Sequence, residues 1–209
     1  EQGNKKLGKR DGAKDVLDYL RDGYLPEALM SFIATMGWND GTEQEVFTER
    51  ELIEKFSLAR VQRSGARFDE KRLLWMNGHF IRQLTLDQLY DRVGGASYGD
   101  LLAEGFWPDS AAGADETYKK QVLLLVQDRL KTLRDVPMMT DYFFAEPTVD
   151  MTLITGNKQL SKLSTDEVAT LLKAVSAKLG ELETWQPDQI QAVLNLLLET
   201  TGQKPAILF

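Results

Sequence analysis

Apolar side chains recur three or four positions apart along most of this chain, and no stretch keeps the alternation of apolar and polar residues that a half-buried strand shows. The fold class predicted from this pattern is all-α. In the first part of the chain, the expected helices begin at capping residues or at a proline. They cover residues 16–20, 26–36, 48–56 and 69–76, and a further helix opens at residues 85–88.

The clearest helical pattern lies later, from Glu116 to Arg134. Its expected buried stripe is aliphatic and consists of Val122, Leu123, Leu125, Val126, Leu130 and Leu133. The segment Asp135-Val136-Pro137 is expected to stop this helix, and residues 138–144 to form a short apolar helix. Two more helices are expected at residues 164–179, opened by a capping box, and at residues 187–202, opened by a proline.

A segment with a diffuse hydrophobic pattern separates these two parts of the chain. Residues 94–114 are rich in glycine and alanine and contain Pro108. We therefore expect a domain boundary between residues 84 and 97.

The composition restricts the chemistry that the chain can carry. It contains no cysteine, which excludes disulfides and thiolate metal sites and is compatible with a reducing compartment. His79 is the single histidine, which disfavours a histidine-based zinc site or catalytic triad. No apolar run has the length of about 18–20 residues that a membrane helix needs, and the N-terminus lacks the apolar core of a signal peptide. The expected location is the cytoplasm, with no membrane partner.

The charge is unevenly distributed. The formal net charge of −7 disfavours nucleic-acid binding, because the phosphate backbone attracts positive surface. Between residues 49 and 72, however, seven basic residues stand against five acidic ones, whereas between residues 84 and 118 Arg92 is the single basic residue among seven acidic ones. Such asymmetry fits a protein with one basic face and an acidic back. The alternative is the ordinary patchiness of a helical surface.

The start of the chain carries a basic motif, Lys5-Lys6-Leu7-Gly8-Lys9-Arg10. Lysine is a compact charge on a flexible stem and can reach a polyphosphate whose position shifts during a reaction. Glycine lets the backbone bend close to such a ligand. Taken alone, the motif is a weak signal, because a basic patch of this size beside a chain terminus is more often a solvated turn.

Longer segments give this motif a context. Residues 6–10 (KLGKR) resemble the KLSKR form of the KMSKS loop of class I aminoacyl-tRNA synthetases, and residues 10–38 are similar to the segment after that loop in bacterial glutamyl-tRNA synthetases. Residues 74–82 (LWMNGHFIR) resemble the W-x-N-G-x-[FY]-I segment of the same family. Weaker similarity continues through VQDRLKTLRDVPMMTDYFF and TTGQKPAILF, so the resemblance spans nearly the whole chain.

Two departures from the family pattern matter. Gly8 stands where the family usually has serine, so a hydroxyl is lost while the lysines remain. The family also carries an HIGH-type signature in a Rossmann half ahead of the loop, and this chain has no such half. The resemblance therefore implies a C-terminal fragment of a larger enzyme, and the apolar end Ile207-Leu208-Phe209 leads us to expect further chain beyond it.

The resemblance implies a division into three parts. Residues 1–14 would form the end of the KMSKS-type loop, residues 15–92 a helical stem-contact fold, and residues 93–209 an α-helical anticodon-binding domain truncated at its C-terminus. The intact enzyme would ligate glutamate to tRNA through a glutamyl-adenylate, using ATP with Mg²⁺. The fragment alone would hold no catalytic residue, no metal and no bound cofactor, and is expected to be inactive.

The resemblance also names candidate site residues. Lys6, Lys9 and Arg10 would contact ATP as the loop does in the family, and this chain has no nucleotide fold of its own to complete that site. The partner would be glutamate tRNA, and whether glutamine tRNA is also bound stays open. The arginines expected to contact tRNA are Arg60, Arg63, Arg67, Arg129 and Arg134. For Arg129 and Arg134, expected on the helix ending at residue 134, a solubilising surface role is the alternative.

Residues 74–82 are expected to be structural. Trp75 should pack inside with Ile81, Asn77-Gly78 should tighten or shift the helix, and His79 should lie at the surface or half-buried. Two other functions remain open from the sequence. One is a free-standing helical tRNA-binding module without ligase activity, and the other is a helical protein-interaction domain.

Overall fold

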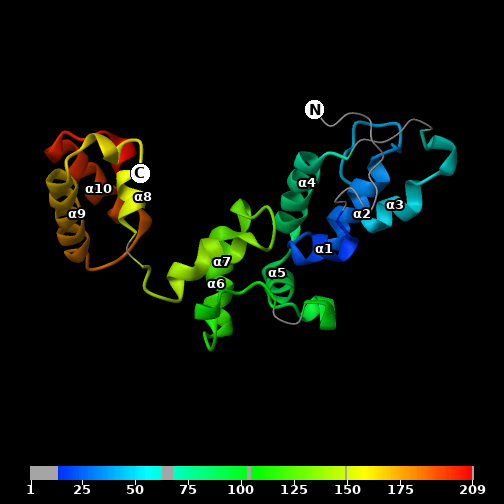
Figure 1. The fold of residues 1–209 in the computed structure, drawn as a ribbon, viewed down its shortest axis with the longest axis horizontal. Coiled ribbons are helices and arrows are strands. Elements are labelled where there is room, and N and C mark those ends of the chain that lie inside the picture. Colours follow the sequence, from blue (N-terminus) through cyan, green and yellow to red (C-terminus); the bar gives the residue numbers. More distant parts are fainter. Residues whose placement is uncertain (1–13, 63–67, 103–104, 149, 209) are drawn as a thin grey trace. The chain divides into compact units, whose positions relative to one another are not determined.

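The computed structural model describes residues 14–62, 68–102, 105–148 and 150–208. In these ranges the chain forms α-helices and short 3-10 turns and contains no strand, which confirms the all-α fold (Figure 1). Two compact units divide the chain, unit 1 from Glu1 to Pro147 and unit 2 from Thr148 to Phe209. Each unit is described by itself.

Unit 1 holds seven of the α-helices that the structure describes, joined by 3-10 turns. The α-helices are α1 (Val16–Arg21), α2 (Pro26–Thr35), α3 (Glu49–Lys55), α4 (Glu70–Gln83), α5 (Leu86–Val93), α6 (Glu116–Val126) and α7 (Asp135–Thr140). The 3-10 turns are η2 (Leu58–Arg60), η3 (Ala96–Leu102), η4 (Asp109–Ala111), η5 (Gln127–Arg129) and η6 (Asp141–Phe143).

The core of unit 1 forms where α2 packs on α4 and α5 packs on α6. Both parts share one apolar cluster, which also takes in the segment after η5. Its most deeply buried side chains include Phe32, Leu73, Met76, Ile81, Leu89, Leu123, Leu130 and Leu133. A second, smaller cluster of Trp38, Phe47 and Leu52 holds α3 and the loop before it.

The boundary predicted between residues 92 and 93 falls in the last turn of α5, and α5 packs against α6 within unit 1. An ion pair also joins Lys120 Nζ on α6 to the Asp87 carboxylate on α5 at 2.6 Å. The division into compact units follows contacts within the chain, whereas the predicted boundaries separate parts by function. The functional boundaries after residues 14 and 92 therefore stay predictions.

The helix starts follow the local chemistry that the sequence predicts. Thr48 and Ser164 form capping boxes with Glu51 and Glu167, each residue of a pair bonding the backbone N–H of the other. Thr85 forms the same arrangement at the start of α5. Asp69 caps α4 by accepting hydrogen bonds from the first-turn backbone. These starts confirm the predicted positions.

The long helix predicted from residue 116 to residue 134 is wrong. α6 ends at Val126, and the chain continues through η5 and an extended Leu130. Leu130 and Leu133 are buried as predicted, but Leu125 is 64% exposed. Gln127 gives the physical reason, because its side-chain Nε2 donates to two carbonyl groups at the end of α4, those of Ile81 and Leu84. These tertiary contacts replace the next helical turn.

Asp135-Val136-Pro137 begins a helix instead of stopping one. α7 runs from Asp135 to Thr140, so the short helix predicted at 138–144 starts three residues earlier and ends in η6. Proline is tolerated there because the N–H groups of a first helical turn have no partner within the helix. The Asp135 carboxylate accepts hydrogen bonds from the N–H groups of Lys131 and Thr132, at 2.8 and 2.9 Å, and so fixes the turn before α7.

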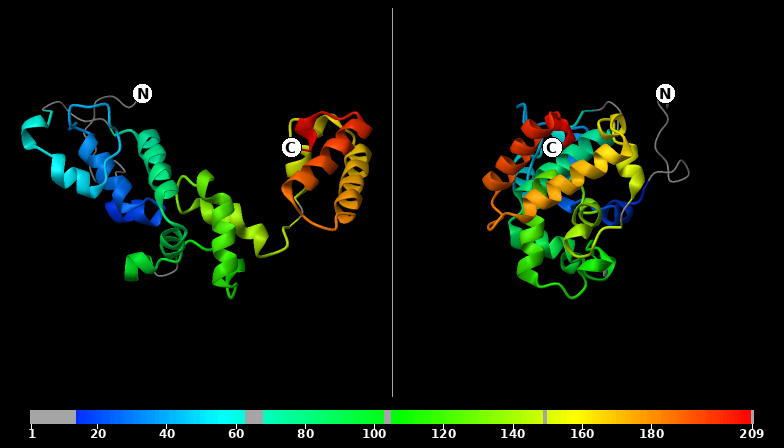
Figure 2. Two further views of the ribbon diagram at one scale, coloured as in Figure 1. Left: turned by 180° about the vertical axis from the view of Figure 1, so that it is seen from behind. Right: turned by 90° about the vertical axis from the view of Figure 1, so that its left-hand side faces the viewer.

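Unit 2 is a small helical unit built from α8 (Met151–Thr155), α9 (Thr165–Gly180) and α10 (Pro187–Thr201), with the 3-10 turns η7 (Leu160–Lys162) and η8 (Pro205–Ile207). α9 and α10 pack side by side, as the views in Figure 2 show. Their contact buries four aliphatic side chains, Val168, Leu171, Leu197 and Leu198. Gly202 ends α10 in the left-handed conformation, with φ of 67°.

In the part of the chain that the structure describes, no helix combines the length and the apolar character that crossing a bilayer requires.

Candidate nucleic-acid interface

The predicted site residues fall into two groups. Lys6, Lys9 and Arg10, together with Arg63 and Arg67, lie outside the described residues. Arg60, Arg129 and Arg134 lie within them and are exposed. The surroundings of these three arginines show which surfaces unit 1 offers to a partner.

Asn77 lies beneath the first of these surfaces. It is fully buried on α4, and α4 continues without a break through Asn77 and Gly78. Its side-chain oxygen accepts a hydrogen bond of 2.8 Å from the N–H of Leu25, and its side-chain nitrogen donates to the carbonyl of Lys131 at 2.6 Å. A longer contact of 3.4 Å reaches the carbonyl of Gly23. Asn77 therefore joins α4 to the turn before α2 and to residues 130–135, instead of tightening or shifting its helix.

Two glycines allow these backbones to approach closely. A Cβ on Gly78 would lie 3.2 Å from the Leu130 carbonyl oxygen and 3.5 Å from Lys131 Cα. Gly23 has φ of 82°, and a Cβ there would stand 2.6 Å from the backbone nitrogens of Leu133 and Arg134. Leu133 N–H completes the contact by donating to the Gly23 carbonyl at 2.9 Å. Residues 130–135 are thus pressed against α4 and the turn after α1.

Trp75 does not pack inside, contrary to the prediction. It is 49% exposed, and its ring lies against that of the half-buried His79, with centroids 6.0 Å apart. The reason is the helical period, since Leu73, Met76 and Phe80 already occupy the buried face of α4. His79 lies where the sequence predicts.

Arg129 and Arg134 do not share a helix. Arg129 ends the turn η5, and Arg134 stands just before α7. The Nε of Arg134 donates to the Arg21 carbonyl at 2.8 Å. The two terminal nitrogens of the Arg134 guanidinium remain available to other partners. Arg134 therefore belongs to the same 130–135 segment that Asn77 binds through the Lys131 carbonyl.

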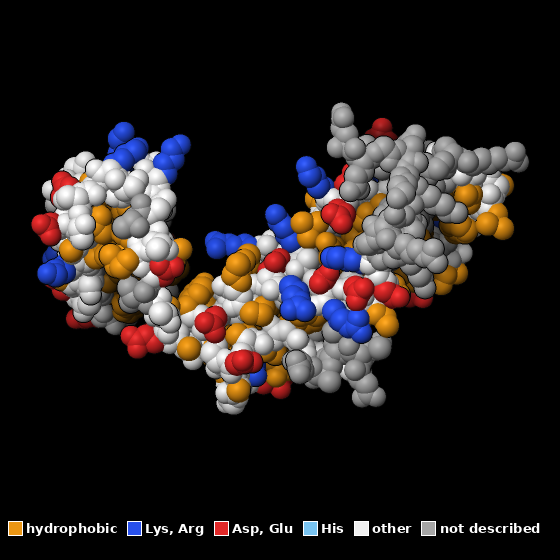
Figure 3. Space-filling view, viewed as in Figure 1, with side chains coloured by type: hydrophobic (Ala, Val, Ile, Leu, Met, Phe, Trp, Pro, Cys, Tyr) orange, Lys and Arg blue, Asp and Glu red, His pale blue; other side chains and the backbone are white. Residues whose placement is uncertain are grey.

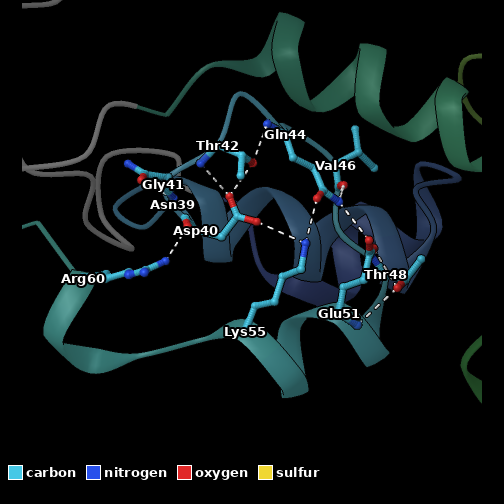
Figure 4. Close-up of polar contacts among 10 residues, drawn as sticks. All are labelled: Asn39, Asp40, Gly41, Thr42, Gln44, Val46, Thr48, Glu51, Lys55 and Arg60. Carbon is cyan, nitrogen blue, oxygen red and sulfur yellow. Dashed lines mark hydrogen bonds and ion pairs between the residues drawn. The ribbon is translucent and has the colours of Figure 1, made fainter.

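Arg60 belongs to a different network, drawn in Figure 4, which fixes the loop before α3. Lys55 Nζ bridges the Asp40 carboxylate at 3.1 Å and the Gln44 side-chain oxygen at 2.9 Å. Gln44 in turn donates to Glu51 Oε1 at 3.0 Å, and Glu51 is the partner in the capping box of α3. Arg60 donates from Nη1 to the Asp40 carbonyl.

The Asp40 carboxylate is the most strongly perturbed acid of this network. Hydrogen bonds from the Thr42 hydroxyl and N–H, followed by the Lys55 ammonium, lower the pKa of Asp40 to about 2. The hydroxyl contact is 2.6 Å long. Asp40 is therefore ionised at neutral pH and holds Lys55 in place.

Much of the basic stretch between residues 50 and 72 is engaged in contacts of this kind. Arg50 pairs with Glu54 at 2.9 Å, and Arg72 donates to the Thr35 hydroxyl at 3.1 Å. Arg92, the lone basic residue of the acidic stretch, pairs with Glu27 on α2. Among the described residues, Arg50, Lys55, Arg60 and Arg72 are thus already engaged within the chain.

A polar cavity of about 520 Å³ lies between the end of α2, the loop that follows it and the start of α4. Arg72, Glu43 and Glu45 are among the residues that line it. The mixed charge favours neither an anion nor a cation. Across the described residues, no group of three or more histidine or acidic side chains could hold a metal ion.

Two family models match the chain. The model of the class I tRNA synthetase (E and Q) catalytic domain matches residues 1–75, and the model of an anticodon-binding domain matches residues 96–209. The glutamate–tRNA ligase of Roseiflexus sp. is 34% identical over 209 residues, which is 100% of this chain. The chain belongs to the glutamyl-tRNA synthetase family.

Other members of the glutamyl-tRNA synthetase family agree with this assignment. The glutamate–tRNA ligase of Moorella thermoacetica is 40% identical over 143 residues, covering 68% of this chain and 28% of that protein. The ligase of Geobacillus thermodenitrificans is 32% identical over 98% of this chain. The chain spans about 40% of the length of the Roseiflexus and Geobacillus proteins.

A solved structure shares the fold. The crystal structure of a glutamate tRNA ligase from Elizabethkingia meningosepticum, in complex with its amino acid, matches with a TM-score of 0.69 at 20% identity. The match covers 97% of this chain and 41% of that one.

Two exposed cations beside the Asn77 contacts, Arg82 and Lys131, were not predicted from the sequence. Each lies within five positions of a motif residue, Asn77 or Arg134. The apolar period of Leu73, Met76 and Phe80 could have placed Arg82 on the opposite, exposed face of α4. No signal in the sequence could have brought Lys131 beside it.

Proposed function

We propose that this chain is the tRNA-binding, C-terminal part of a bacterial-type glutamyl-tRNA synthetase. The observation that carries the proposal is the match of glutamate–tRNA ligases along the full length of the chain. The whole protein would ligate glutamate to tRNA at the expense of ATP, through a glutamyl-adenylate, in the cytoplasm. The exclusively helical character of residues 105–148 and 150–208 supports an anticodon-binding role for the second part.

ATP would be a substrate of the whole protein, with Mg²⁺ accompanying its phosphates. Lys6, Lys9 and Arg10 would contact those phosphates, because they occupy the positions of the family's KMSKS-type loop and because residues 1–75 match the catalytic-domain model. A mobile cation is suited to stabilising charge as pyrophosphate separates. By itself the chain would bind neither ATP nor Mg²⁺ and would form no adenylate.

The tRNA partner would be glutamate tRNA, with glutamine tRNA a possible second substrate. Arg63, Arg67, Arg129 and Arg134 remain candidates for phosphate contact. Arg60 is a weaker candidate, since its Nη1 is already engaged with the Asp40 carbonyl. Phosphate contacts would position the RNA, and contacts to unstacked bases would distinguish one tRNA from another.

A chimera tests the ligase proposal. In it, this chain replaces the matching 209 residues of the Roseiflexus glutamate–tRNA ligase. The chimera should form glutamyl-adenylate and glutamyl-tRNA, whereas the chain alone should show no glutamate-dependent ATP–pyrophosphate exchange. Lys9→Ala in the chimera should lower the rate of adenylate formation about 10²–10³-fold, or about 2–4 kcal/mol, with a smaller effect on glutamate binding.

Arg50→Gln is the matched control, because it removes one positive charge from an exposed ion pair far from the loop in sequence. A folded chimera that binds glutamate tRNA but cannot charge it would contradict the ligase proposal. An unchanged rate of adenylate formation in Lys9→Ala would indicate that the basic motif is a solvated turn.

A further inference from the structure

Two segments of unit 1 that are far apart in the sequence place cations on one surface. Arg82 lies on α4, and its Nη1 would be 3.2 Å from a Cβ on Gly78. Lys131 Cα would be 3.5 Å from the same point, on the segment that passes over Gly78. Arg134 follows in the same turn, anchored by its Nε at the Arg21 carbonyl. We call Arg82, Lys131 and Arg134 the 82/131/134 surface.

Two cations of this surface are free to bind a partner, and the third, Arg134, is engaged through its Nε alone. Arg82 and Lys131 are exposed, and neither side chain has a hydrogen-bond or ion-pair partner among the residues that the structure describes. One oxygen of the nearby Asp135 carboxylate, Oδ2, accepts the N–H groups of both Lys131 and Thr132. This differs from the basic stretch of residues 50–72, where Arg50, Lys55 and Arg60 are held by contacts within the chain.

The backbone beneath these cations is fixed. Asn77 bonds the Lys131 carbonyl at 2.6 Å, and Leu133 N–H bonds the Gly23 carbonyl at 2.9 Å. Cations on a fixed backbone lose less conformational freedom on binding than cations on a loose loop, which favours affinity. In Figure 3, Lys and Arg side chains stand along the face of unit 1 turned to the viewer, with acidic groups between them.

We propose that the 82/131/134 surface binds the phosphate backbone of the tRNA. This inference rests on the proposed function, which supplies a polyanionic RNA as the partner. Unpaired cations on an otherwise acidic chain are complementary to a phosphate backbone, and each phosphate contact releases condensed counterions. Arg134 was a predicted tRNA contact, and the structure adds Arg82 and Lys131 to it. The contacts are to phosphates and carry no sequence preference.

The test uses the 209-residue chain and a transcript of glutamate tRNA, titrated between about 50 and 200 mM salt. The double variant Arg82→Gln/Lys131→Gln should bind more weakly, and its slope of log K against log salt should be shallower by roughly 1.4–1.8. Its circular dichroism should match wild type, because neither side chain has a partner in the described part of the fold. The loss should be equal for an unrelated tRNA.

The matched control is Arg50→Gln/Lys178→Gln, which removes the same charge from two cations that are already paired with Glu54 and Glu181. Its slope should stay at the wild-type value. Suppose that wild type binds tRNA and that the Arg82→Gln/Lys131→Gln variant keeps both the wild-type affinity and the wild-type salt slope. The proposed role of this surface is then wrong, while the proposed function stands. If wild type binds no tRNA, both fail. Competition by ATP at equal phosphate concentration would contradict an RNA surface.

Discussion

At the residue scale, the side chain of Asn77 joins two distant backbone segments. Its amide satisfies backbone groups of two segments that are more than fifty positions away from it in opposite directions along the chain. Buried backbone groups left without a partner cost more than an ordinary hydrogen bond contributes. The two residues of the N-G pair in LWMNGHFI therefore act together. Asn77 bonds the backbones of Leu25 and Lys131, and Gly78 leaves room for the segment that contains Lys131.

Asn77→Ala should lower the free energy of unfolding of unit 1 by about 2–4 kcal/mol, because it leaves the buried Leu25 N–H and the half-buried Lys131 carbonyl without their partner. Urea unfolding followed by tryptophan fluorescence measures this in a Trp185→Phe background, where the remaining tryptophans, Trp38, Trp75 and Trp107, all lie in unit 1. Gln83→Ala, on the exposed face of α4, should change stability by less than about 0.5 kcal/mol. Equal effects of the two variants would contradict the role given to Asn77.

Asp40 gives a pH dependence with a definite sign. Its pKa in the folded chain is about 2, below the ordinary value of an aspartate, so the ionised form stabilises the fold above about pH 4. That contribution is lost as the pH falls from about 4 toward 2. Between those values, wild type should lose more urea resistance than Asp40→Asn, which has no carboxylate to protonate. Asp91→Asn, at an exposed position, should follow wild type, and a parallel fall in all three proteins would exclude Asp40 as the source.

Among the helices, the sequence predicts where a helix starts better than where it ends. Capping boxes at Thr48, Thr85 and Ser164 are local chemistry, and they lie where the sequence indicates. The end of α6 is set by Gln127, whose side chain binds carbonyls of a helix 43–46 positions earlier. The apolar period continues through Leu130 and Leu133 because both are buried, although neither is in a helix. The spacing of apolar residues alone cannot distinguish a buried residue in a helix from a buried residue in the segment that follows it.

The turn between α1 and α2 offers a test of how closely two elements meet. Gly23 and Gly113 both have positive φ, at 82° and 77°, but a Cβ on Gly113 would have no atom within 4 Å. Gly113→Ala should therefore cost only the penalty of the left-handed conformation, about 1–2 kcal/mol. Gly23→Ala meets backbone nitrogens at 2.6 Å and should destabilise unit 1 by clearly more. Similar urea midpoints for the two variants would show that the 130–135 turn can move away.

At the scale of the whole molecule, the sequence predicted the family and the all-α class, because long motifs in the right order carry both. It did not predict which cations are free. Seven basic residues between positions 49 and 72 suggest a binding face, yet Lys55 and Arg60 are tied to the loop around Asp40. Conversely, Arg82 and Lys131 stand 49 positions apart in the sequence, and the fold brings both of them close to Gly78. Pairing of charges depends on tertiary contacts that composition does not contain.

The same scale gives the most direct test of the account. The central claim is that this chain binds tRNA as part of a glutamyl-tRNA synthetase, with the anticodon read by the region of residues 96–209. The decisive measurement is a titration of the chain with three transcripts: glutamate tRNA, the same tRNA with a replaced anticodon, and an unrelated tRNA, each at low and high salt.

The account predicts that glutamate tRNA binds most tightly, that replacing its anticodon weakens binding, and that all three affinities fall as salt rises. Equal, salt-insensitive binding of the three transcripts, or no binding at high protein concentration, would contradict it and favour a protein-interaction domain.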